Sequence, residues 1–243
     1  MITATVLGDG PLGRAIGQAL RARGDAVAIL GRPEGGRHLP EQLGGGDVVI
    51  DASRSEAVAS NVDAALAAGC RAFVIATTGW HADVDRVGAA LRRAGATAVV
   101  APNLALGAAL FLRLVDEAAR LAAALGGFEP SVVEWHRRSK ADRPSGTARE
   151  IVRRMSSALP LELDEVAVVR SGSMPGQHAV ALDGTSETIE LRLTARDRAG
   201  YAAGALAAID WLATERHSPG IHSFDAVVDA LIARRSAAAR AVA

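Results

Sequence analysis

One segment of the sequence concentrates the side chains that could do chemistry. Residues 134–150 read EWHRRSKADRPSGTARE, which places one histidine, one lysine and several arginines around a Pro-Ser-Gly-Thr turn. An imidazole titrates near neutral pH and can transfer a proton, whereas lysine and arginine bind carboxylates. A run of charges is more often a solvated surface. The segment therefore predicts either a proton donor beside an anion site or an exposed loop.

The flanking sequence predicts how this segment is held. The apolar run Val132–Trp135 predicts a strand, which would deliver His136 at its end. Pro144 disfavours helix at the residue before it, so a helix that includes Ala148–Ala158 can begin near the turn. The first turn of such a helix offers backbone N–H groups and hydroxyls beside the cations, and this arrangement suits a small carboxylate ligand.

A second interpretation of the turn is purely local. Thr147 and Glu150 have the spacing of a capping box, in which two side chains bind the first backbone N–H groups of a helix. Capping would use some of the donors that a ligand needs. It leaves His136 and Lys140 without a role, which favours the interpretation as a site.

A glycine-rich turn near the N-terminus predicts a dinucleotide site. Residues 8–13 read GDGPLG, after a strand expected over Thr3–Leu7 and at the start of a helix expected over Leu12–Arg23. In this setting the first glycine allows a tight turn, the second lets a pyrophosphate approach the backbone, and the third lets helix and strand pack closely. A turn that serves packing alone is the alternative. The expected cofactor contacts here are Gly8, Gly10, Pro11, Leu12 and Gly13.

The end of the next expected strand, Ala26–Leu30, bears on the choice of cofactor. It is followed by Gly-Arg-Pro, and the first acidic residue is Glu34. An acidic side chain at the strand end would bind the ribose hydroxyls of NAD, whereas Arg32 could pair with the 2′-phosphate of NADP. A solvated turn arginine explains Arg32 nearly as well. We therefore expect NADPH or NADH, with NADPH favoured.

Strands and helices alternate through the first hundred residues. This order predicts an α/β domain with a Rossmann-type, doubly wound parallel sheet covered on both faces. Segments at the carboxyl ends of two strands should lie where such sheets bind ligands, although each could also be an ordinary capped turn. They add Ala76, Thr77, Thr78, Pro102, Asn103 and Leu104 to the expected cofactor contacts. The further expected elements are strands over Asp47–Asp51, Ala72–Thr77 and Ala96–Ala101, helices over Ser55–Ala68 and His81–Ala94, and an irregular loop over Gly35–Gly46.

The pattern changes after residue 105. A long helix is expected, with one apolar stripe formed by Leu106, Leu110, Leu114, Ala118, Leu121 and Leu125. Strand-like runs then follow without helices between them, which favours a mainly antiparallel sheet and an α+β second domain. We expect a first domain over 1–104, completed by helices within 199–243, and a second domain over 105–198. The further expected strands are Val166–Arg170, His178–Leu182 and Thr188–Ala195, and the closing helices are Tyr201–Thr214 and Phe224–Ala239.

Composition narrows the class of protein. The chain has 243 residues, 49% of them apolar, and 27 basic residues balance 27 acidic ones. Zero formal charge without a long basic block argues against nucleic-acid binding, and no apolar window predicts a membrane span or a signal peptide. The single cysteine, Cys70, is expected to be a buried, inert thiol. We therefore expect a cytoplasmic protein and predict no metal ligands.

The segment described first resembles a family signature. Residues 134–148 are similar to E-x-H-H-x-x-K-x-D-x-P-S-G-T-A, the pattern of 4-hydroxy-tetrahydrodipicolinate (dihydrodipicolinate) reductases. The resemblance extends over nearly the whole chain, through the glycine turn and through segments 51–53, 77–79, 102–103, 170–178 and 198–204.

This resemblance implies an NAD(P)H-dependent oxidoreductase of lysine and diaminopimelate biosynthesis. The reaction would reduce 4-hydroxy-tetrahydrodipicolinate to tetrahydrodipicolinate, with hydride added to a ring carbon and a proton to its neighbour. The first domain would bind the nucleotide, and the second would bind a cyclic dicarboxylate and form a homotetramer. The resemblance also adds Arg198 and Tyr201 to the cofactor contacts.

The same resemblance assigns roles within the signature. His136 would be the general acid. Lys140, with Ser145, Gly146 and Thr147, would hold a substrate carboxylate, and the lysine would also stabilise charge on the ring.

Departures from the family pattern keep other functions open. Arg137 replaces the second histidine of the signature; it could still bind a substrate carboxylate but cannot titrate as histidine does. Tyr201 for phenylalanine, Ala76 for glycine and Leu104 for phenylalanine are smaller changes. The alternatives are a reductase or amino-acid dehydrogenase of the same fold acting on another small carboxylate, and a non-catalytic nucleotide sensor. A sensor would need no proton donor such as His136.

Overall fold

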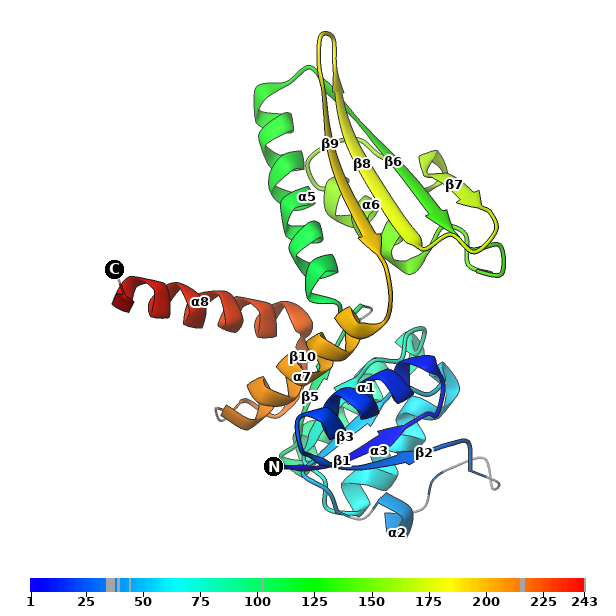
Figure 1. Cartoon of the computed structure of the whole chain (residues 1–243), viewed down its shortest axis with the longest axis vertical. Coiled ribbons are helices and arrows are strands. Elements are labelled where there is room, and N and C mark those ends of the chain that lie inside the picture. Colours follow the sequence, from blue (N-terminus) through cyan, green and yellow to red (C-terminus); the bar gives the residue numbers. More distant parts are fainter. Residues whose placement is uncertain (34–37, 39, 44, 102, 215–216, 243) are drawn as a thin grey trace. The chain divides into compact units, whose positions relative to one another are not determined.

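The computed structural model describes residues 1–33, 38, 40–43, 45–101, 103–214 and 217–242 (Figure 1). The chain divides into two compact units. Unit 1 consists of Met1–Leu106 with Arg198–Ala243, and unit 2 consists of Gly107–Asp197. The expected fold class is confirmed, because unit 1 contains a parallel sheet and unit 2 contains a smaller mixed sheet.

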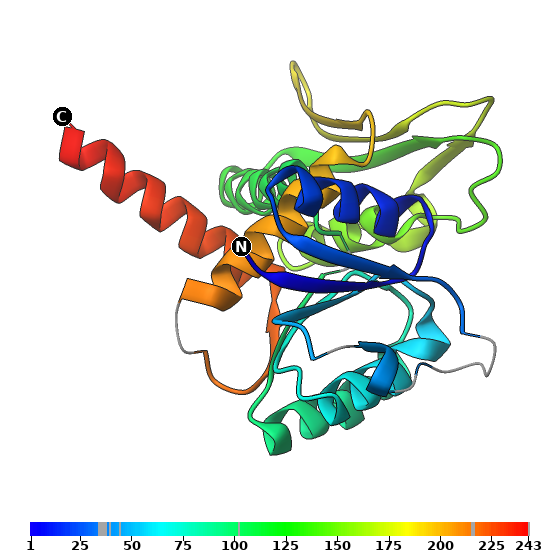
Figure 2. The same cartoon turned by 60° about the horizontal axis from the view of Figure 1, so that its bottom comes forward.

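Unit 1 is built on a six-stranded parallel sheet with the order β10-β5-β4-β3-β1-β2. Helices α1 and α7 cover one face of the sheet and α3 and α4 cover the other, as Figures 1 and 2 show. Burial on both faces explains why the central strands are continuous apolar runs. The strands are β1 (Thr3–Leu7), β2 (Ala26–Leu30), β3 (Val48–Asp51), β4 (Ala72–Ile75), β5 (Thr97–Val100) and β10 (Gly220–Ser223). The helices are α1 (Pro11–Ala22), α2 (Pro40–Leu43), α3 (Val58–Ala67), α4 (Val84–Ala94), α7 (Ala199–Thr214) and α8 (Phe224–Val242), with 3₁₀ turns at Ser55–Ala57 and His81–Asp83.

Two elements of unit 1 differ from expectation. Strand β10 was not predicted, because its sequence GIHS has no strand-like run; it pairs with β5 at the edge of the sheet. The stretch expected as an irregular loop contains α2, whose Leu43 is buried against the core. A single buried leucine in a glycine-rich stretch gives no periodicity from which a helix could be predicted.

Unit 2 has a four-stranded sheet with the order β7-β6-β8-β9. Strands β6, β8 and β9 are antiparallel neighbours, and β7 runs parallel to β6. Apolar residues of α5 and α6 form one core with the sheet, among them Phe111, Val115, Ile151, Met155 and Val180. The elements are α5 (Leu106–Leu125), β6 (Phe128–His136), α6 (Gly146–Met155), β7 (Ala167–Arg170), β8 (Gly176–Gly184) and β9 (Thr188–Ala195), with a 3₁₀ turn at Leu163–Glu165.

The apolar stripe predicted on α5 lies on the outside of unit 2. Four of its leucines are 46% to 78% exposed, and the buried face is formed instead by smaller or aromatic residues such as Phe111, Val115, Ala119 and Ala122. Alanines let the helix approach its neighbours closely. Helix α5 is thus apolar on two faces, and periodicity alone does not indicate which face packs. The exposed leucines are Leu110, Leu114, Leu121 and Leu125.

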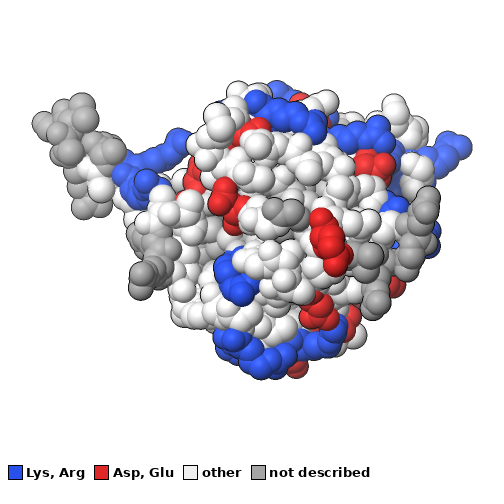
Figure 3. All heavy atoms as spheres, turned by 90° about the horizontal axis from the view of Figure 1, so that it is seen from below, with Lys and Arg blue, Asp and Glu red and all other residues white. Residues whose placement is uncertain are grey.

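The surface agrees with the balanced composition. Figure 3 shows acidic and basic side chains interspersed with uncharged surface on the face in view. Among the described residues, the helices are too short or too polar to cross a membrane.

Cys70 is buried as expected, and burial raises the pKa of its thiol.

Candidate active site

The glycine turn of unit 1 joins β1 to α1, and its three glycines do different work. A side chain on Gly8 would place its Cβ 2.3 Å from the backbone oxygen of Ala52, and one on Gly13 would lie 1.9 Å from the oxygen of Gly8. At Gly10, the residue that caps α1, a Cβ would meet no heavy atom within 4 Å. Packing therefore explains the first and third glycines. The open space at the second, above the N-terminus of α1, is what a pyrophosphate would require.

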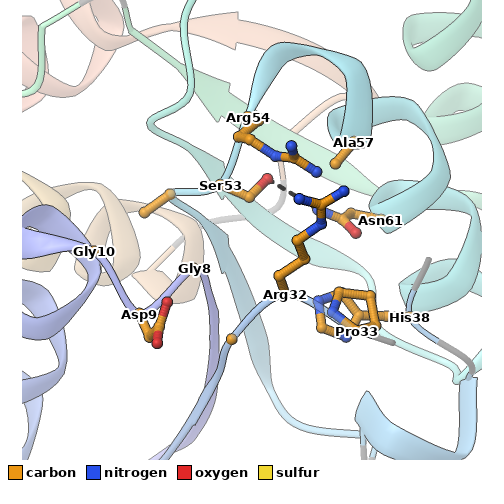
Figure 4. Close-up of a pocket in the computed structure, with 12 residues that line it drawn as sticks. Gly8, Asp9, Gly10, Arg32, Pro33, His38, Ser53, Arg54, Ala57 and Asn61 are labelled. Carbon is orange, nitrogen blue, oxygen red and sulfur yellow. Dashed lines mark hydrogen bonds between the residues drawn. The ribbon is translucent and has the colours of Figure 1, made fainter. Parts of the chain in front are cut away.

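A pocket of about 310 Å³ lies beside this turn. Arg32, after β2, and Arg54, after β3, extend their side chains into the same region (Figure 4). The only carboxylate among the described lining residues is that of Asp9. Two guanidinium groups near one position suit a phosphate, because each can donate two parallel hydrogen bonds. The described lining residues are Gly8, Asp9, Gly10, Gly31, Arg32, Pro33, His38, Ala52, Ser53, Arg54, Ala57 and Asn61.

The carboxylate of Asp51 fixes the side chains of two residues that line this pocket, Ser53 and Asn61. Asp51 is buried at the end of β3, where Oδ1 accepts hydrogen bonds from the Ser53 hydroxyl (2.7 Å) and the Thr77 hydroxyl (2.6 Å). Its Oδ2 accepts from the Asn61 side chain at 2.8 Å. The loops after β3 and β4 are therefore fixed to each other at the carboxyl edge of the sheet. The Thr77 hydroxyl takes part in this internal network.

The other expected nucleotide contacts lie around the same edge. Ala76 and Thr78 follow β4, and Asn103 and Leu104 follow β5. The Asn103 side chain accepts a hydrogen bond from the Ala105 N–H at 2.9 Å, and the Leu104 side chain is buried. Pro102 lies outside the described residues.

Two residues that the family resemblance added to the cofactor contacts do not line this pocket. Arg198 and Tyr201 are at the start of α7, where the Arg198 carbonyl accepts a hydrogen bond from the Tyr201 N–H at 3.1 Å. Neither is among the described residues that line the pocket. Glu34 lies outside the described residues.

The signature segment forms a second cluster in unit 2. Strand β6 ends at His136, and Glu134 lies two residues earlier, so both side chains point to the same face of the sheet. The strand register places Glu134 opposite His178 of β8 and His136 beside Arg170 of β7. Residues from three strands and from the N-terminus of α6 therefore meet around one carboxylate.

Glu134 is the centre of this cluster and is 0% exposed. Arg170 donates a 2.6 Å hydrogen bond to Oε1, and the Ser145 N–H lies 3.1 Å and 3.2 Å from the two oxygens. The ring nitrogens His136 Nδ1 and His178 Nε2 each lie 3.5 Å from Oε2. Burial alone would raise the pKa of Glu134, but His178, Ser145 and Arg170 outweigh burial and hold the pKa far below its usual range. The carboxylate is therefore ionised.

The imidazole of His136 is close to neutral at pH 7 in this structure. Burial lowers its pKa to about 4, the negative charge of Glu134 opposes this shift, and His178, Lys140 and Arg170 add to it. A neutral imidazole cannot donate a proton as a general acid. A bound dicarboxylate would add negative charge and raise the pKa of His136, which would make the expected proton donation possible.

Lys140 and the N-terminus of α6 were expected to form an anion site, and both contact the Asp142 carboxylate. The Lys140 ammonium lies 2.7 Å from Oδ1 of Asp142. Burial alone would raise the pKa of Asp142, but Lys140 and the Gly146 N–H lower it further than burial raises it. A Cβ on Gly146 would meet no heavy atom within 4 Å, so space is open in front of the helix. Thr147 is the next residue of the first turn.

The cap of α6 differs from the local interpretation of the sequence. Ser145, not Thr147, is the capping residue, and its hydroxyl accepts a hydrogen bond from the Ala148 N–H at 3.2 Å and contacts His178 Nε2 at 3.0 Å. Glu150 pairs with two arginines further along the helix instead of completing a capping box. The N–H and hydroxyl of Ser145 thus hold the cluster together.

Arg137 lies apart from the buried cluster. Its side chain is exposed, and its Nε donates a hydrogen bond to the Ser139 hydroxyl at 3.1 Å. The position where the signature has its second histidine therefore contributes no contact to Glu134 in this conformation.

Donor atoms of Glu134, His136 and His178 lie within 4.8 Å of one another, a composition found in metal sites. Here, however, the Arg170 guanidinium already neutralises the carboxylate at 2.6 Å. A divalent cation would have to bind beside this fixed positive charge.

Comparisons with known proteins decide the family. The model "Dihydrodipicolinate reductase, N-terminus" matches residues 5–104, and "Dihydrodipicolinate reductase, C-terminus" matches residues 107–228. The chain belongs to the dihydrodipicolinate reductase family. The 4-hydroxy-tetrahydrodipicolinate reductase of Archaeoglobus fulgidus is 34% identical over 197 residues, 74% of each chain, and that of Methanospirillum hungatei is 34% identical over 198 residues, 75% of this chain and 76% of the relative.

A solved structure supports the fold assignment. A dipicolinate-bound dihydrodipicolinate reductase from Paenisporosarcina sp. TG-14 superimposes with a TM-score of 0.70 at 19% identity, covering 92% of this chain and 98% of that one. The sequence-based interpretation of this dihydrodipicolinate reductase family member as an oxidoreductase with a nicotinamide cofactor is confirmed.

Several residues of the two clusters were not assigned roles from the sequence. Arg54 follows β3, and the rule that ligands bind at the carboxyl ends of parallel strands could have found it, whereas Asn61 lies within α3. Arg170 and His178 lie within recognised family segments, but only the strand register shows that they meet Glu134.

Proposed function

We propose that this dihydrodipicolinate reductase family member reduces 4-hydroxy-tetrahydrodipicolinate to tetrahydrodipicolinate in lysine and diaminopimelate biosynthesis, with NADPH as the preferred cofactor. The observation that carries the proposal is the cluster at the end of β6. There, His136, Lys140 and the N-terminus of α6 bring a titratable group and an anion site into one small region of unit 2.

The chain's own residues define how the reaction would proceed. The cofactor, when bound, supplies the hydride. Lys140 and the N–H groups of Gly146 and Thr147 bind a substrate carboxylate, and Lys140 stabilises negative charge that develops on the ring. The bound carboxylates raise the pKa of His136, which then donates a proton to the ring carbon next to the one that receives the hydride. Arg137 would contribute to substrate binding from the exposed side of the segment.

The preference for NADPH is supported by the pocket beside the glycine turn. The 2′-phosphate would lie between Arg32 and Arg54, with the pyrophosphate above Gly10 and the N-terminus of α1. Contacts from the segments after β4 and β5, and from Arg198 and Tyr201, remain predictions for the rest of the cofactor.

We also propose that the protein is a cytoplasmic homotetramer. The helices of unit 2 pack on one face of its sheet, and Val133 and Trp135 point to the opposite face, where they are half-buried and Arg192 lies over the Trp135 ring at 5.7 Å. This sheet face supports self-association, and four chains of 25.0 kDa would give about 100 kDa in sedimentation velocity. The lone buried thiol of Cys70 suits a reducing compartment.

A coupled assay tests the activity directly. The substrate is generated in situ from pyruvate and aspartate semialdehyde by the upstream synthase, and oxidation of NADPH, and separately NADH, is followed by absorbance. Synthase-dependent oxidation supports the proposal. Tight nucleotide binding without oxidation would contradict it and would favour another substrate or a nucleotide sensor; Arg137→His would then be the first reversion to test.

A substitution at His136 tests its role as the proton donor. His136→Gln should lower kcat by about 10²- to 10⁴-fold, the usual contribution of a general acid, without changing the Kd for NADPH. His81→Gln, at an exposed position of unit 1, is the matched control and should keep full activity. Unchanged turnover of the His136 variant would remove it as the proton donor.

A further inference from the structure

The buried carboxylate of Glu134 has no role in the mechanism described so far. Burial of an ionised carboxylate is costly unless charges and hydrogen bonds compensate for it. Arg170, itself 1% exposed, and the Ser145 N–H provide this compensation and also fix the orientation of the carboxylate. One oxygen, Oε2, is thereby held facing the two histidine rings.

The ring of His136 meets this carboxylate with one defined edge. Its Nδ1 is buried, makes no hydrogen bond to the described residues, and lies 3.5 Å from Glu134 Oε2. Its Nε2 lies on the other edge, where a side chain on Gly176 would come within 3.1 Å. The absence of a side chain at Gly176 leaves room beside Nε2, whereas Nδ1 is turned toward the protein interior.

Among the charged groups around His136, Glu134 has the opposite effect on the pKa of that histidine. The imidazole faces Glu134 on its own strand β6, His178 on β8 with ring centroids 5.2 Å apart, Arg170 on β7, and Lys140 in the loop after β6. Arg170, Lys140 and the second imidazole disfavour a positive charge on His136. Glu134 is the one group in this set that favours it.

We propose that Glu134 is a positioning residue for the reduction: it keeps a proton on Nδ1 of His136, so that Nε2 delivers the other proton, and it stabilises the imidazolium that forms when substrate binds. This inference rests on the proposed function. During the step, the Nε2–H bond breaks and a C–H bond forms on the substrate ring. The imidazole is left neutral with Nδ1–H facing Glu134, and solvent reprotonates Nε2.

The isosteric variant Glu134→Gln removes the charge and keeps the shape. Because an opposite charge at this distance raises the pKa of a histidine, its loss should lower the pKa of His136 in the substrate complex by about 1 unit or more. The falling limb of the kcat–pH profile, where His136 loses its proton, should move to lower pH by the same amount. We expect kcat at pH 7.5 to fall about tenfold or more, with KM and the NADPH Kd within about threefold of wild type.

Two further variants separate this role from general destabilisation. Glu150→Gln removes another carboxylate that is paired with two arginines in unit 2, and it should leave the pH profile in place. Glu134→Asp keeps the charge and should restore the position of the falling limb, even if its shorter side chain lowers kcat. A uniform loss of rate in Glu134→Gln, with an unmoved limb, would contradict the proposal and indicate a structural role.

A measurement without turnover makes the test independent of the proposed function and of any folding defect in the variant. The ¹⁵N chemical shifts of His136 in the wild-type chain, assigned with His136→Gln, report which ring nitrogen carries the proton. Protonated Nδ1 and bare Nε2 are expected at pH 7, with a rise in the His136 pKa when dipicolinate is added. Protonated Nε2 and bare Nδ1 would overturn the proposal even if the enzyme is active. If the wild type instead fails to oxidise NADPH or NADH when the synthase supplies the substrate, the proposed function is overturned.

Discussion

Gly10→Ala should separate nucleotide binding from folding. The added methyl group would meet no heavy atom within 4 Å, and the backbone of Gly10, with φ of −69°, is already accessible to alanine. Alanine caps a helix less well than glycine, by about 0.5–1 kcal/mol, whereas its smaller freedom in the unfolded chain returns about 0.4–1 kcal/mol. The free energy of unfolding should therefore change by less than about 1 kcal/mol, which is about 2–4 °C in Tm for a chain of this size.

The methyl group would, however, occupy the space above α1 that the pyrophosphate needs. Close approach to the backbone is the reason for glycine at this position, so we expect the Kd for NADPH to rise at least about tenfold, or about 1.4 kcal/mol. Nucleotide fluorescence titration measures this change, and calorimetry measures Tm on the same samples.

Gly13→Ala is the matched comparison. Its Cβ would lie 1.9 Å from the backbone oxygen of Gly8, and backbone atoms cannot move aside as a flexible side chain can. Overpacking of this kind costs about 1–3 kcal/mol or more, so Tm should fall by roughly 2–12 °C or more. Wild-type NADPH affinity in Gly10→Ala would refute the phosphate position. A wild-type Tm in Gly13→Ala would refute the steric argument.

Two further predictions concern the positively charged side chains of Arg32 and Lys140. Arg32→Ala should raise the Kd for NADPH about 10- to 100-fold, since a hydrogen bond to a charged group contributes about 1.5–3 kcal/mol, and leave the Kd for NADH nearly unchanged; equal losses in the two fluorescence titrations would remove Arg32 from the 2′-phosphate. Lys140→Ala should lower kcat/KM for the dicarboxylate about 10²- to 10³-fold in the coupled assay and leave NADPH affinity intact. Arg138→Ala, a neighbouring exposed cation, is the control, and a normal kcat/KM for Lys140→Ala would disprove its role.

The local patterns of the sequence predicted most of unit 1. Alternating apolar runs and helical periods indicated β1 to β5 and their helices, because each of these elements carries its own signal. Strand β10 carries none: it is four residues long and is specified by the free edge of β5. Its existence depends on a partner more than a hundred residues earlier in the chain, which no local window contains.

The candidate site could be predicted only in part for the same reason. His136 and Lys140 lie in one short segment, so residue type and spacing were enough to indicate chemistry. Arg170 is 36 residues from Glu134, and His178 is 33 residues from Ser145. Their contacts depend on the register of three strands, and one register shift would turn each side chain to the opposite face.

The contact between Lys140 and Asp142 limits the binding free energy that a substrate carboxylate can gain at Lys140. The ammonium already has a carboxylate partner within the chain, so a ligand's carboxylate would replace a similar group and gain only the difference between the two contacts. A ligand with a single carboxylate would gain little from this exchange. A ligand with a second carboxylate could gain a further contact, for example at Arg137 as proposed above, so the resident aspartate would favour dicarboxylates over simple acids.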